Sequence, residues 1–146
     1  MTCSTVCETT LNVASKYTLY VALPLVLAIA IYFLFRSTPP PLLMTLSDQF
    51  SMTHRPMWLG SEFDWFVYNL PDALWAFSFT SFLLIACRND HPTTRKTYLA
   101  FGSFLMIGVE VAQGSYLPGT YDHLDVLATV AGMGLSYLLL RRLSHQ

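Results

Sequence analysis

Long apolar runs separated by short polar stretches dominate the chain. Four of these runs approach the roughly 20 residues that a helix needs to cross the hydrocarbon core of a bilayer. They cover residues 17–35, 65–87, 98–117 and 123–140. Because exposed backbone is not tolerated in lipid, each run is predicted to be helical. The pattern therefore predicts an all-α fold, a four-span transmembrane helical bundle that forms a single membrane domain over residues 1–146.

The longest connection separates the first two predicted spans. Its consecutive prolines at positions 39–41 impose extended backbone, so the first helix must end before them. Its later part carries aromatic and methionine side chains among polar residues, which is typical of a segment that rests on the outer interface or caps the bundle. The sequence thus predicts a longer outer loop between spans 1 and 2.

The first apolar run contains the tripeptide Ala28-Ile29-Ala30, which has the form of a signal-peptidase site. Cleavage there is one alternative. However, apolar residues continue through Phe35, which makes the run long enough to span the membrane and leaves no polar start for a cleaved chain. The run is therefore predicted to be an uncleaved anchor.

Composition and charge agree with a membrane protein and limit its partners. The chain is 53% hydrophobic and only 12% charged, and its formal net charge of -1 excludes nucleic acid as a natural partner. The basic residues gather at Lys16, in the segment 88–96 and at positions 141–142, which share one side of a four-span model. The positive-inside rule makes that side cytoplasmic, with both termini. The three isolated cysteines then face a reducing compartment and offer no zinc site.

Polar side chains interrupt the last three spans. With the predicted topology they fall in the outer half of the bundle, although they come from three helices: Asp72, Glu110, Gln113, Asp122 and Asp125. A carboxyl group at membrane depth is costly and is a candidate for function. Asp72, Glu110 and Asp125 are the candidate acid, base or ligand groups, that is, the candidate catalytic residues.

Each of these residues also has a structural interpretation. Asp122 can cap the last helix, with Asp125 at the third helical position. Asp72 can satisfy backbone groups freed by a kink at Pro71. Glu110 has the weakest structural alternative, because a mid-span carboxyl must be protonated, paired or hydrated.

A second pattern predicts helix packing. Small residues recur every four positions at Ala128, Gly132 and Ser136, and again at Gly108 and Ala112. Outside these faces lies an aromatic set, which is predicted to face lipid and the interface: Trp65, Phe66, Tyr68 and Trp75.

The segment 108–134 resembles the signature of VanZ-like membrane proteins. The resemblance rests on Glu110 and Gln113, the run from Pro118 to Asp122, then Asp125 and Gly132. It departs from the family pattern at Thr120, where the family usually has Arg, and at Thr129, where it usually has Asn. The resemblance implies a small multi-span bundle of the bacterial cytoplasmic (inner) membrane, in a family named for a component linked to glycopeptide-antibiotic tolerance.

Taken together, these features favour an acidic pocket that binds or acts on an envelope lipid or a lipid-linked ligand. Gln113, Tyr121 and Asp122 are its candidate binding residues. Without the family's Arg, the pocket suits protons, a cation, or a cationic or hydroxyl-rich ligand. No cofactor or metal is predicted, although an oxygen-only ligand set would suit Mg²⁺ better than zinc.

Whether the chain is an enzyme stays open, because the sequence has no identifiable nucleophile and no basic phosphate cradle. Two alternatives use the same carboxyl groups differently. In one, the chain is a non-enzymatic scaffold that binds a lipid, a partner membrane protein or a second copy of itself. In the other, it is part of a proton-coupled transporter.

Overall fold

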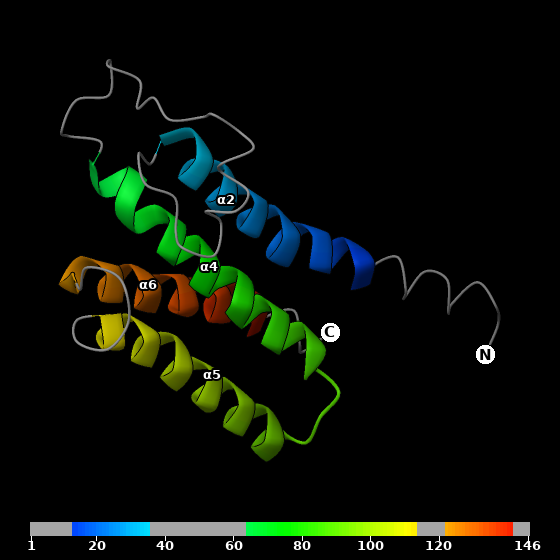
Figure 1. Ribbon diagram of the computed structural model, residues 1–146. Helices are drawn as coiled ribbons and strands as arrows, with labels where there is room; N and C mark the ends of the chain where they lie inside the picture. Colours follow the sequence, from blue (N-terminus) through cyan, green and yellow to red (C-terminus); the bar gives the residue numbers. More distant parts are fainter. Residues whose placement is uncertain (1–12, 36–63, 114–121, 142–146) are drawn as a thin grey trace.

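The computed structural model describes residues 13–35, 64–113 and 122–141, and these are helical apart from short turns. The elements are η1 (Thr18–Ala22), a π-helical segment, α2 (Leu23–Phe35), α4 (Asp64–Ala86), α5 (Pro92–Gln113) and α6 (His123–Arg141) (Figure 1). A continuous helix over Val13–Phe35 contains the first two. The prediction of an all-α chain is confirmed for this part.

Three of the described helices are long and apolar enough to cross a membrane, namely Val13–Phe35, Trp65–Ala86 and His123–Arg141. They support a multi-pass membrane protein. The helix α5 is not one of them. The fourth predicted span, 98–117, and the outer loop both extend into residues outside the described part, so these two features stay predictions.

The helix α4 lies at the centre of the bundle. It packs most extensively against α6, and it also packs against α2 and η1, whereas α5 packs more loosely on α4 and α6. Figure 1 shows α4 and α6 running in one direction and α2 and α5 in the other. Both chain reversals between α4, α5 and α6 therefore place the start of α4, the end of α5 and the start of α6 at one end.

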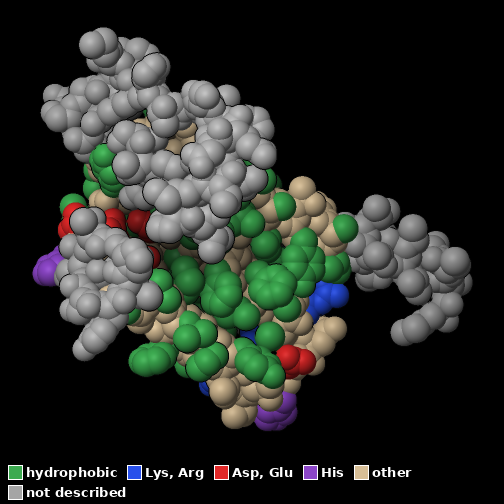
Figure 2. Space-filling model, in the orientation of Figure 1, with side chains coloured by type: hydrophobic (Ala, Val, Ile, Leu, Met, Phe, Trp, Pro, Cys, Tyr) green, Lys and Arg blue, Asp and Glu red, His purple; other side chains and the backbone are tan. Residues whose placement is uncertain are grey.

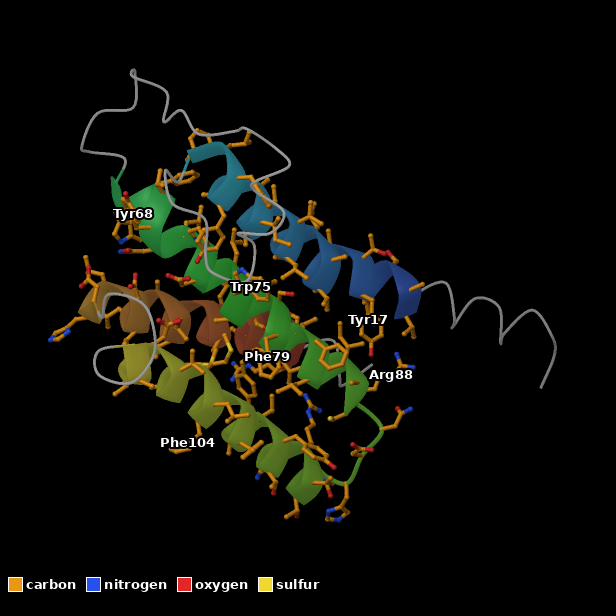
Figure 3. All side chains as sticks on the ribbon, in the orientation of Figure 1. Tyr17, Tyr68, Trp75, Phe79, Arg88 and Phe104 are labelled. Carbon is orange, nitrogen blue, oxygen red and sulfur yellow. The ribbon has the colours of Figure 1, made fainter. Side chains whose placement is uncertain are left out.

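The surface of the bundle is more apolar than a soluble helical protein requires. Phe104, for example, is 72% exposed and points away from the other helices (Figure 3), and green apolar side chains cover much of the face in Figure 2. The predicted outward-facing aromatic set is confirmed, since all four members are exposed: Trp65, Phe66, Tyr68 and Trp75. An apolar exterior of this extent suits a lipid environment.

The interior, by contrast, contains many small and polar side chains. Six buried residues of α4 and α6 are polar: Asn69, Ser78, Thr80, Ser81, Thr129 and Ser136. The Oγ atoms of Ser81 and Ser136 lie 2.8 Å apart and share a hydrogen bond between the two helices. Ser78 donates to the carbonyl oxygen of Val21 at 2.8 Å. Hydrogen bonds between helices contribute to association where lipid removes the hydrophobic driving force.

A proline explains the irregular first helix. Pro24 has no N–H and its ring would clash with the carbonyl of residue 20 in a regular helix. The chain widens into the π-helical turn directly before it, where the N–H of Leu23 bonds to the carbonyl oxygen of Thr18. The bond from Ser78 meets the chain in this same turn.

Glycine sets the distance between α4 and α6. A Cβ atom on Gly132 would lie 2.1 Å from the carbonyl oxygen of Ala73, so only glycine fits here. Ala128 and Ser136 are buried on the same face, which confirms the predicted packing face of this helix. The matching prediction at Gly108 is wrong, because no described atom lies within 4 Å of its Cβ position.

The α4–α5 contact uses a different glycine. A Cβ atom on Gly102 would lie 2.6 Å from Leu83 and 3.0 Å from Phe79, whose ring projects from α4 toward α5 (Figure 3). The small-residue pattern did not reveal this position, because Gly102 has no small partner four residues along.

Candidate functional site

The bundle has an acidic end and a basic end. The acidic end carries the carboxyl residues Asp72, Glu110, Asp122 and Asp125 from three helices, and red side chains gather at one end of the bundle in Figure 2. The opposite, basic end carries the described Lys and Arg residues: Lys16, Arg88, Arg95, Lys96 and Arg141. Arg36 and Arg55 lie outside the described residues. The three helices therefore bring the predicted carboxyl groups to one end of the molecule.

The depths of these groups differ. At about 1.5 Å per residue, Asp72 lies roughly 12 Å from the start of α4, whereas Asp125 lies roughly 3 Å from the start of α6. Glu110 lies roughly 4.5 Å before the end of α5. All three side chains are half-buried, and each has an interacting neighbour. Asp72 is thus the carboxyl group farthest from the end of its helix.

Asp72 is held by a residue that the sequence did not single out. The hydroxyl of Tyr32, on α2, donates to Oδ1 of Asp72 at 3.0 Å. This bond joins α2 to α4 next to Pro71, which is fully buried. A hydrogen bond to a carboxyl group is stronger than a neutral one, so it fixes the position of Asp72. The only sequence signal for this role was the hydroxyl group of Tyr32 within an otherwise apolar run. A tyrosine in such a run is more often an interface anchor.

Asp122 caps α6, as one of the two interpretations predicted. Its Oδ1 accepts the backbone N–H of Leu124 at 3.1 Å, and its carbonyl oxygen accepts the N–H of Asp125 at 3.2 Å. Asp122 is exposed, whereas Asp125 is half-buried. One carboxylate oxygen of Asp122 therefore has a structural role, and Asp125 is the stronger candidate of the pair for binding.

Two predicted binding residues fall at or beyond the edge of the described chain. Gln113 is the last residue of α5, with a side chain outside the described set. Tyr121 also lies outside the described residues. Their assignment to the site stays a prediction.

Thr129 is a buried polar residue that was not among the predicted site residues. It is fully buried, and its Oγ1 has no hydrogen-bond partner among the described groups. Because α4 and α6 run in parallel and Gly132 meets Ala73, Thr129 lies at the level of the α4 turn that ends in Asp72. The sequence had marked Thr129 only as a departure from the VanZ-like pattern.

Metal binding is not evident in the described part, where no three His, Cys, Asp or Glu side chains are grouped to hold an ion. The described carboxyl groups of the acidic end are thus not arranged as a ready ligand set for Mg²⁺.

The basic end contains a buried free cysteine, Cys87, just after α4. Burial raises the pKa of its thiol, and the negative charge of Asp90 and a hydrogen bond to that side chain raise it further, while Arg95 opposes them. A raised pKa keeps the thiol protonated and unreactive near neutral pH. Cys87 is therefore a packing residue of this end.

No family model, curated protein or solved structure matches this chain. The resemblance to VanZ-like proteins stays a prediction from the residues of segment 108–134.

Proposed function

We propose that the chain is a VanZ-like, four-span protein of the bacterial cytoplasmic membrane, with both termini and the basic end in the cytoplasm. The positive-inside rule supports this orientation, because the described Lys and Arg residues share one end. The fourth span would be formed by α5 and the residues that follow it. The acidic end then faces the outer leaflet.

In this arrangement the acidic end is a pocket that binds or acts on an envelope lipid or a lipid-linked ligand. The observation that carries the proposal is the placement of Asp72, Glu110 and Asp125, from three helices, at one end of the bundle. The bond from Tyr32 supports a pre-formed site, because it holds Asp72 from a fourth helix. Asp72, Glu110 and Asp125 would act as acid, base or ligand groups, and Gln113, Asp122 and Tyr121 would contribute to binding.

The test is purification with native lipid, followed by mass spectrometry of the wild type and Glu110→Gln. We expect the wild type to retain a lipid that the variant loses, because the amide cannot carry a negative charge. The matched control is Asp90→Asn, which removes an exposed carboxyl group from the opposite end. Equal lipid content in the wild type and Glu110→Gln would remove Glu110 from the site.

A second function, a non-enzymatic membrane scaffold, is favoured by the tight α4–α6 contact and its buried serine pair. In that case the carboxyl groups serve as hydrogen-bonding groups between helices, and Glu110→Gln is tolerated because an amide also donates and accepts. Native mass spectrometry of the same two proteins separates the two functions, since only a scaffold would keep its partner or second copy in Glu110→Gln.

A further inference from the structure

The hydroxyl of Thr129 has an unmet hydrogen bond in the middle of the α4–α6 contact. It is fully buried and has no partner among the described groups. A buried hydroxyl without a partner costs free energy, so such groups are normally bonded to protein, water or ligand. Ser81 and Ser136 in the same seam are equally buried, but they bond to each other, whereas Thr129 has no described partner.

The position of Thr129 connects it to the acidic end. Asp125 precedes it by four residues, which is one helical turn, and so lies above it on the same face of α6. On the facing helix, the turn that ends in Asp72 lies at the same level, as set by the contact of Gly132 with Ala73. The hydroxyl therefore lies one helical turn below Asp125 and at about the level of Asp72 on the facing helix.

This combination selects for a ligand that donates hydrogen bonds and carries positive charge. Carboxylate oxygens accept and do not donate, and a threonine hydroxyl can accept as well. A primary ammonium group has three N–H donors, which can serve several oxygens at once. A trimethylammonium group has the same charge but no N–H donor, so it cannot satisfy the hydroxyl.

We propose that the acidic end binds the primary ammonium group of a lipid headgroup, with Asp125, Asp72 and Thr129 as the groups that hold it. This inference rests on the proposed lipid-binding function and names the chemistry of its headgroup. Because Thr129 is fully buried, binding includes a movement of the side chains around it. The lipid would reach the acidic end from the outer leaflet.

The experiment compares two zwitterionic lipids that differ only in methylation of the nitrogen. The full chain in detergent is titrated with phosphatidylethanolamine or phosphatidylcholine of the same acyl chains, and bound lipid is counted by native mass spectrometry. We expect phosphatidylethanolamine to bind about tenfold more tightly, since a hydrogen bond to a charged group is worth about that factor. Asp125→Asn and Thr129→Val should each lose this preference, whereas Ser136→Ala, which alters a bonded hydroxyl deeper in the seam, should keep it.

Thermal unfolding in detergent without lipid shows whether each variant is folded. Thr129→Val keeps the shape of the side chain and removes an unpaired hydroxyl, so its Tm should equal or exceed that of the wild type. A lower Tm in Thr129→Val, with the lipid preference intact, would assign the hydroxyl to an internal water and overturn its role in the headgroup site.

The remaining outcomes separate this inference from the function on which it rests. Equal binding of both lipids overturns the ammonium site and leaves lipid binding in place. No binding of either lipid, and no native lipid in the purified protein, overturns the proposed function itself. A further titration with free ethanolamine tests the source of the amine: competition at equal concentration would overturn the assignment to a lipid.

Discussion

Replacement of Gly132 by alanine tests the α4–α6 contact that organises the acidic end. The added Cβ atom would lie 2.1 Å from the carbonyl oxygen of Ala73 and 2.9 Å from its carbonyl carbon. These are backbone atoms, which cannot rotate away, so the helices must separate by about 1 Å to reach an ordinary carbon–oxygen contact. That shift stretches the 2.8 Å bond between Ser81 and Ser136 beyond hydrogen-bonding range.

The magnitude follows from three contributions. Overpacking of a tight contact costs about 1–3 kcal/mol, and the lost hydrogen bond costs about 1 kcal/mol. Alanine returns up to about 1 kcal/mol through its higher helix propensity. The net effect of Gly132→Ala is a loss of about 2 kcal/mol in the free energy of unfolding, which lowers Tm by several degrees.

The assay is thermal unfolding in detergent, followed by intrinsic fluorescence. Gly134→Ala is the matched control, because Gly134 lies two residues away on the same helix and no described atom is within 4 Å of its Cβ position. The control should be neutral or slightly stabilised. A Tm for Gly132→Ala at or above that of the wild type would refute the close contact and the register of α4 against α6.

Three further predictions concern hydrogen bonds and one thiol. Tyr32→Phe should lower stability by about 1–2 kcal/mol, because Asp72 loses its donor at 3.0 Å, and chemical denaturation in mixed micelles measures this loss. Asp122→Ala should cost about 1 kcal/mol through loss of the helix cap, whereas Asp122→Ser should restore most of it in the same assay. Alkylation of Cys87 in the folded protein should require a higher pH than alkylation of a free thiol, and Asp90→Asn should shift the profile toward lower pH, since the removed charge had raised the pKa. An unshifted profile in Asp90→Asn would contradict the last prediction. The pKa of Cys87 is higher in the folded protein than in the unfolded chain, so its protonated thiol contributes to the free energy of unfolding. This contribution is fully present below the unfolded pKa and is lost as the pH rises through the folded pKa.

The helices were the most predictable part of the structure, because apolar length alone defines a membrane-spanning segment. The predicted span 65–87 differs from α4 by one residue at each end, and 123–140 differs from α6 by one residue at its end. The start of α5 was missed by six residues. Pro92 begins that helix at a position where its missing N–H has no cost, and among the residues that follow only Arg95 and Lys96 are strong helix formers.

The contacts between helices were less predictable, because they depend on register and rotation. Small residues at four-residue spacing identified Gly132 correctly and Gly108 incorrectly, since the pattern says which residues permit close approach and not where a partner lies. The bond between Tyr32 and Asp72 joins residues 40 positions apart, and neither residue specifies the other. The carboxyl residues could be assigned to one end only because chain reversals set the direction of each helix.

The direction of the helices also determines which carboxyl group is suited to chemistry. Asp122 and Asp125 lie at the start of α6, where the positive end of the helix dipole favours a negative charge by about 0.3–1 kcal/mol. Glu110 lies in the last turn of α5, where the dipole opposes a negative charge by a similar amount and no basic residue is present. The two aspartates thus lie at a helix end that favours an anion, whereas Glu110 lies at one that does not. Because Glu110→Gln keeps the size of the side chain and its capacity to hydrogen-bond, a lipid lost in this variant at an unchanged Tm reports on binding and not on unfolding.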